Sequence, residues 1–100
     1  MQPGNAAYYQ KILRDNLAML RKKYLLTSIA IFGSVARGEN SSESDVDLLV
    51  DFEKPIGLAI VDLKDELEEL LCARVDIIPI NAMRRRPRLY ELIKSDLIHV

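Results

Sequence analysis

An apolar run that opens with two carboxylates restricts how this chain can fold. Residues 45–52 read Asp-Val-Asp-Leu-Leu-Val-Asp-Phe. A short run this rich in apolar residues predicts a buried β-strand. Because side chains alternate between the two faces of a strand, Asp45 and Asp47 are expected to point to the same face. Two carboxylates held that close repel each other, which raises a pKa unless a cation lies between them.

Three further segments are predicted as strands. Residues 25–32 form an apolar, partly β-branched run that ends at Gly33, and residues 74–79 form another that ends at a proline. Residues 97–100 are expected to form a short closing strand. A helical turn over Ser34–Gly38 and a polar loop over 39–44 separate the first two strands. We therefore expect a mixed sheet rather than a purely parallel one.

Helical periodicity marks three other segments. Asn5 can cap a first helix, in which apolar residues recur at steps of three and four: Tyr9, Leu13, Leu17, Leu20 and Tyr24. A second helix shows the same spacing at Ile60, Leu63, Leu67 and Leu70. Pro87 is suited to the first turn of a third helix that extends to about Ser95. Residues 81–87 before it are predicted to be a basic connection.

This order of elements predicts an α/β fold of the α+β kind. The expected architecture is a two-layer sandwich, with a mixed sheet of three or four strands and helices packed on one face. One hundred residues are enough for a single domain, residues 1–100. The composition, 49% hydrophobic and 29% charged, is that of a soluble globular protein.

The cellular setting is expected to be the cytoplasm. No apolar run approaches the roughly 20 residues that a membrane span needs, and the N-terminus lacks the pattern of a secretory leader. The single cysteine, Cys72, cannot form an internal disulfide and is predicted to be a small core residue. Membrane association is therefore not expected.

Charge counts argue against nucleic acid as the main partner. The chain has 14 basic and 15 acidic residues, a formal net charge of −1, whereas dedicated nucleic-acid binders show a basic excess. The basic run Arg84–Arg88 is interpreted as a solvated loop and helix start. Contact with RNA, or docking of an acidic protein or of nucleotide phosphates, remain alternatives for this run.

A third carboxylate, Asp76, interrupts the β-branched run 74–79. Burying a lone charge there would be costly. If this strand lies next to the one that carries Asp45 and Asp47, the three carboxylates converge. Such a set could hold two Mg²⁺ ions, an arrangement that serves in-line displacement at phosphorus. The alternative is a simple ion pair between Asp76 and Arg74.

Gly33 and Ser34 form a candidate phosphate-binding turn, because they end a strand and open a helical turn. Glycine lets the backbone approach a ligand closely, and the free amides at a helix start attract anions. The Ser34 hydroxyl adds a donor, and Arg37 is placed to reach a phosphate oxygen. Helix capping by Ser34 and a surface salt bridge of Arg37 are the alternatives.

These motifs together resemble the signature of the DNA polymerase β-type nucleotidyltransferase superfamily. The form Gly-Ser-x-Ala-Arg-Gly-Glu at 33–39, followed by Ser-Asp-x-Asp-Leu-Leu-Val at 44–50, is similar to its minimal nucleotidyltransferase (MNT) group. The resemblance covers nearly the whole chain and implies the nucleotidyltransferase fold. It also implies that Gly33 and Ser34 bind the β,γ-phosphates of ATP. Metal ligation by Asp45, Asp47 and Asp76 is implied as well, with Asp76 assisting the attacking hydroxyl.

The resemblance further implies a partner. MNT proteins are often antitoxins encoded beside HEPN-family ribonuclease toxins, and some transfer AMP from ATP to a tyrosine of that toxin. A 100-residue chain has no room for a second domain to hold an acceptor, so we expect a partner protein to present it within a hetero-oligomer. The expected protein is a Mg²⁺-dependent nucleotidyltransferase. The alternatives are a non-catalytic antitoxin that neutralises by binding, and transfer to a small molecule or RNA.

Overall fold

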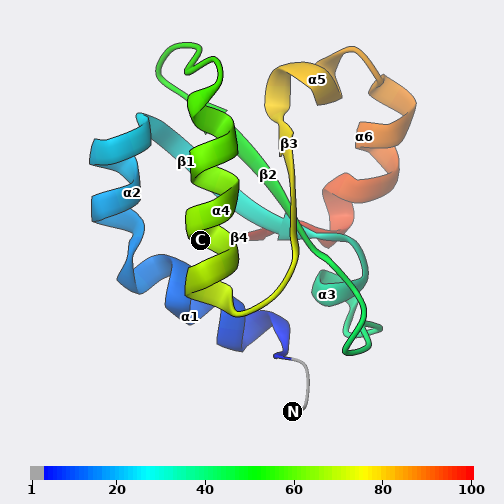
Figure 1. The fold of residues 1–100 in the computed structure, drawn as a ribbon. Coiled ribbons are helices and arrows are strands. Elements are labelled where there is room, and N and C mark those ends of the chain that lie inside the picture. Colours follow the sequence, from blue (N-terminus) through cyan, green and yellow to red (C-terminus); the bar gives the residue numbers. More distant parts are fainter. Residues whose placement is uncertain (1–3) are drawn as a thin grey trace.

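The computed structural model describes residues 4–100 and contains one mixed four-stranded sheet (Figure 1). The strands are β1 (Leu26–Phe32), β2 (Val46–Phe52), β3 (Val75–Pro79) and β4 (Ile98–His99), and they lie in the order β3-β2-β1-β4. β1 pairs antiparallel with both β2 and β4, whereas β2 and β3 are parallel. The predicted α+β fold with a mixed sheet is confirmed.

Three helices cover one face of this sheet: α1 (Ala6–Asp15), α2 (Leu17–Tyr24) and α4 (Ala59–Leu71). As expected, Asn5 caps α1, because its side-chain oxygen accepts a hydrogen bond of 2.8 Å from the backbone N–H of Tyr8. The single first helix that we expected is interrupted at Asn16, whose side-chain amide donates to the carbonyl of Ile12 at 2.8 Å. Asparagine competes in this way with regular helical hydrogen bonding.

The main hydrophobic core lies between these helices and the sheet. Alternate β2 residues, Val46, Leu48 and Val50, point into it and are buried. They meet apolar side chains that the helical spacing places on the inner faces: Tyr9, Leu13, Leu20, Tyr24, Leu63, Leu67 and Leu71. Leu70, which the spacing marked, is partly buried and packs against this core beside the fully buried Leu71. Cys72, which we expected in the core, is instead exposed at the left-handed end of α4 (φ +51°).

A second, smaller cluster lies on the other face of the sheet, where Phe32 and Leu49 pack against Met83 and Ile93. It is covered by α5 (Ile80–Arg84) and α6 (Pro87–Ile93), and the short 3₁₀ helix η1 (Lys94–Asp96) follows. α6 and β4 agree with prediction. The prediction that 81–87 is only a connection was wrong, because Met83 is buried and anchors α5. One apolar residue in a basic segment gives no periodicity to detect.

The last element, α3 (Gly33–Arg37), is a short helix between β1 and β2. It lies at the end of β1, as the turn over Ser34–Gly38 predicted. Within residues 4–100, no helix is long and apolar enough to cross a membrane.

We predict that the core face of α4 carries much of the stability. Leu67→Ala removes a fully buried side chain and should lower the free energy of unfolding by about 2–5 kcal/mol. Val61→Ala on the exposed side of the same helix, where the side chain is 55% exposed, should change it by less than about 0.5 kcal/mol. Urea denaturation measures both, and equal losses would contradict this assignment of the core.

Candidate functional site

Asp47 and Asp76 lie directly beside each other on the parallel pair of strands. Asp47 of β2 is in register with Asp76 of β3. The neighbours of both residues point into the main core under α1, α2 and α4, so both carboxylates leave the opposite face of the sheet. Asp45 lies one residue before β2 and two before Asp47. The structure thus brings together the three carboxylates that the sequence singled out.

The environment of Asp47 concentrates negative charge. Burial raises the pKa of this carboxyl group above its usual value, and the charges of Asp76 and Asp45 raise it further. The positive charge of Arg37 lowers it in part. Hard oxygen ligands that repel one another suit a divalent cation such as Mg²⁺, which relieves the repulsion. The residues present therefore fit a magnesium site.

Asp45 is turned toward Arg74. Its Oδ1 atom forms an ion pair of 3.1 Å with Nε of Arg74. A second nitrogen of the same guanidinium, Nη2, donates to the carbonyl of Glu43. In the described part of the chain no three acidic, histidine or cysteine side chains are close enough to hold a metal as they stand. A shared ion requires Asp45 to rotate away from Arg74. That ion pair is largely exposed, and such pairs contribute at most about 1 kcal/mol.

The turn at Gly33 is packed against Asp47. Phe32 pairs with Asp47 across β1 and β2, so the residue after Phe32 lies at the same end of the sheet. Gly33 has a left-handed backbone (φ +74°), and a Cβ atom there would collide with Oδ2 of Asp47. The N-cap position of α3 is Phe32, not Ser34, and it makes no side-chain capping bond. The backbone of Gly33 thus lies against the carboxylate of Asp47.

Arg37 links this turn to the end of the chain. Its guanidinium forms ion pairs with Glu39 (Nε to Oε2, 3.1 Å) and with Asp96 of η1 (NH1 to Oδ2, 3.4 Å). The salt-bridge alternative for Arg37 therefore holds in this structure, and its charge still acts on Asp47. Asp96 was missed by sequence reasoning, because 59 positions separate it from Arg37 and no local pattern connects them.

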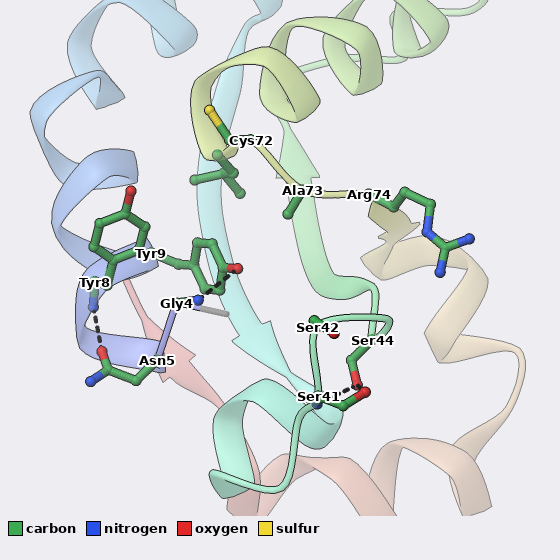
Figure 2. A pocket seen from close by; sticks show the side chains of 11 residues that line it. Gly4, Asn5, Tyr8, Tyr9, Ser41, Ser42, Ser44, Cys72, Ala73 and Arg74 are labelled. Atoms are coloured by element: carbon green, nitrogen blue, oxygen red, sulfur yellow. Dashed lines mark hydrogen bonds between the residues drawn. The ribbon is translucent and has the colours of Figure 1, made fainter. Parts of the chain in front are cut away.

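A groove of about 560 Å³, shown in Figure 2, lies close to Asp45, because Ser44 and Arg74 line it. It runs between the start of α1, the loop 41–44 and the turn from α4 to β3. Tyr9 on one side accepts a hydrogen bond from the Gly4 N–H, and Ser44 on the other accepts one from the Ser41 N–H. The groove includes Arg74, the ion-pair partner of Asp45, but none of the three aspartates. Sequence reasoning did not anticipate it.

Comparison with known proteins identifies the family. The chain belongs to the family of the nucleotidyltransferase domain, whose model matches residues 13–100. It is 40% identical over 92 residues to the "Putative protein adenylyltransferase MJ1217" of Methanocaldococcus jannaschii, covering 91% of this chain and 93% of that protein. It is 43% identical over 70 residues to "Protein adenylyltransferase MntA" of Thermococcus cleftensis, covering 69% and 71% of the two chains.

Solved structures point the same way. A structure described as a "putative minimal nucleotidyltransferase" superposes with a TM-score of 0.72 at 38% identity, covering 88% of this chain and 89% of that one. A second, the "toxin-antitoxin with AMP-PNP", gives a TM-score of 0.54 at 29% identity, covering 72% of this chain and 54% of that one. The resemblance to minimal nucleotidyltransferases seen in the sequence is confirmed.

We predict that Gly33 and Gly38 differ in how much an alanine costs. Both have left-handed backbones, φ +74° and +71°, but only Gly33 would place its Cβ against another residue, Asp47. Gly38→Ala should lower stability by about 1 kcal/mol from backbone strain alone. Gly33→Ala should cost at least twice as much and also weaken Mg²⁺–ATP binding. Thermal unfolding and nucleotide titration measure these effects, and equal losses would show that the contact with Asp47 is unimportant.

A further prediction concerns pH. Since the pKa of Asp47 is raised in the folded chain above its usual 3.8, deprotonation of this group as the pH rises lowers stability. Without divalent metal, Asp47→Asn should therefore melt at a higher temperature than the wild type at neutral pH. The difference should shrink as the pH falls toward about 4. The exposed Asp65→Asn controls for loss of one charge, and a wild type more stable than Asp47→Asn at neutral pH would refute the assignment.

Proposed function

We propose that this protein transfers AMP from ATP to a hydroxyl group of a partner protein. One observation carries the proposal: Asp47 and Asp76 are in register on one face of the sheet, with the Gly33 turn packed against Asp47. Carboxylates for a divalent ion thus lie beside backbone amides suited to phosphate. The two relatives named as protein adenylyltransferases support this choice of reaction.

The residues divide the reaction between them. The Gly33 amide and the Ser34 hydroxyl hold the β,γ-phosphates, and Asp45 and Asp47 would hold Mg²⁺. Asp76, which is exposed, shares this ligation and accepts the proton of the incoming hydroxyl. The hydroxyl oxygen then bonds to the α-phosphorus, the bond to the bridging oxygen breaks, and pyrophosphate leaves with that electron pair. Bound Mg²⁺ supplies charge neutralisation along the triphosphate.

The acceptor is proposed to be a tyrosine of a HEPN-family ribonuclease toxin that forms a hetero-oligomer with this chain in the cytoplasm. Two arguments support it. The carboxylates lie on a face that this small domain leaves accessible at Asp45 and Asp76, so an acceptor can enter from solvent. A solved structure similar to this chain is a toxin–antitoxin complex with the ATP analogue AMP-PNP. The experiment below distinguishes this reaction from two alternatives: neutralisation by binding alone, and transfer to a small molecule or RNA.

Substitution of the carboxylates tests the proposal. The purified chain is mixed with Mg²⁺, α-labelled ATP and the protein encoded by the neighbouring gene, and that partner is analysed by mass spectrometry. The wild type should add AMP to a tyrosine. Asp45→Asn combined with Asp47→Asn, or an excess of chelator, should reduce transfer by at least about a thousandfold because phosphate charge is no longer neutralised.

Asp51→Asn on the same strand is the matched control, and it should retain activity. Toxin neutralisation that survives loss of Asp45 and Asp47 would instead establish masking. Label recovered on RNA or on a small molecule, with none on the protein, would replace the proposed acceptor.

A further inference from the structure

A basic surface lies outside the proposed catalytic residues. Four arginines occupy five consecutive positions at the junction of α5 and α6, and all are exposed: Arg84, Arg85, Arg86 and Arg88. We call these four residues the arginine cluster. Within residues 4–100 none of them forms an ion pair; Arg84 donates only to the side chain of Asn81, at 2.7 Å. Their charge is therefore directed to solvent.

The location of this cluster relates it to the carboxylates. Its helices α5 and α6 cover the same face of the sheet from which Asp47 and Asp76 project, because Met83 and Ile93 pack on Leu49 in that face. From Asp76 the chain advances four residues along β3, about 13 Å, and then about 6 Å along α5 before it reaches the cluster at Arg84. A protein interface of ordinary size, about 800 Å² per partner, is roughly 30 Å across. One protein lying on this face can therefore reach both.

Apolar surface accompanies the charge. A pocket of about 310 Å³ is lined by Ile80, Met83, Arg84, Pro87 and Tyr90. On α6, Leu92 is 73% exposed and Leu89 is 37% exposed. An apolar pocket rimmed by arginine is typical of the anchor points that dominate binding energy between proteins. The surface thus suits an apolar side chain flanked by carboxylates.

The remaining charge of the chain disfavours RNA on this surface. The whole chain carries −1, so removing the four positive charges of the cluster leaves −5 for the remainder. A polyanion that approaches the cluster is repelled by the rest of the domain, whereas a folded protein can direct a local acidic patch at it.

We propose that the arginine cluster and the adjoining apolar pocket dock an acidic surface of the acceptor protein, and so hold its hydroxyl group over Asp76. This inference rests on the proposed function, because it assigns that partner's binding surface. The cluster positions the partner and does not touch the reacting atoms.

Charge reversal tests the docking surface. Arg85→Glu with Arg88→Glu is compared with Arg14→Glu and Lys22→Glu, which change the net charge equally at exposed positions of α1 and α2. Affinity for the protein encoded by the neighbouring gene, the candidate acceptor, is measured by calorimetry at about 50 and 300 mM salt. Reversal in the cluster should weaken binding about tenfold or more and flatten its salt dependence. The control pair should change binding less than threefold or so.

Two further measurements make the result decisive. Arg85→Lys with Arg88→Lys, which keeps the charge, should retain most of the affinity. Mg²⁺–ATP binding should be unchanged in every variant, which excludes misfolding. Unchanged partner binding after reversal, equal loss in the control pair, or no binding by the wild type would overturn the docking surface.

The outcomes separate this inference from the proposed reaction. Binding lost on reversal, with no AMP found on the wild-type partner, supports the surface and refutes the reaction. AMP transfer that persists after charge reversal, with partner binding unaltered, supports the reaction and refutes the docking surface. A labelled single-stranded RNA that loses affinity with Arg85→Glu and Arg88→Glu, while partner binding is unaffected, would assign the cluster to RNA instead.

Discussion

Repulsion between Asp47 and Asp76 is the constraint on which the site depends. The parallel pairing of β2 and β3 fixes these carboxylates side by side. Hydrophobic burial on the opposite face prevents a change of strand register that would separate the two charges. A shift of one residue would turn Val46 and Leu48 out of the core. The core thus supplies the free energy that keeps like charges together, and the resulting field favours a divalent cation and its phosphate ligand.

The sequence predicted the parts of the molecule that repeat or alternate. Helical spacing identified Leu63 and Leu67 as core residues, and the strand predicted over 45–52 lies at Val46–Phe52, with Asp45 just before it. The position of Asp76 beside Asp47 depended on strand order, which the sequence left conditional. Gly33 was singled out for close approach to a ligand, and the structure adds that its nearest neighbour is the Asp47 carboxylate.

Other features escaped prediction because no local pattern encodes them. α5 depends on one buried side chain, Met83, within a basic segment, so burial there could be found only from the tertiary packing. The ion pair of Arg37 with Asp96 joins residues 59 positions apart. Cys72 looked apolar by its neighbours, yet the helix ends at that residue in a left-handed turn and the side chain leaves the core. Chain reversals of this kind move a residue off the face that periodicity assigns to it.

The position of β3 at the edge of the sheet gives Asp76 a second role. β3 is an outer strand of the sheet, and outer strands of apolar sequence tend to pair with strands of other molecules. The apolar residues of β3 favour such pairing, whereas the charge of Asp76, the second residue of the strand, and Pro79 at its end oppose it. The same carboxylate that we assign to proton transfer thus also disfavours pairing of β3 with a strand of another molecule.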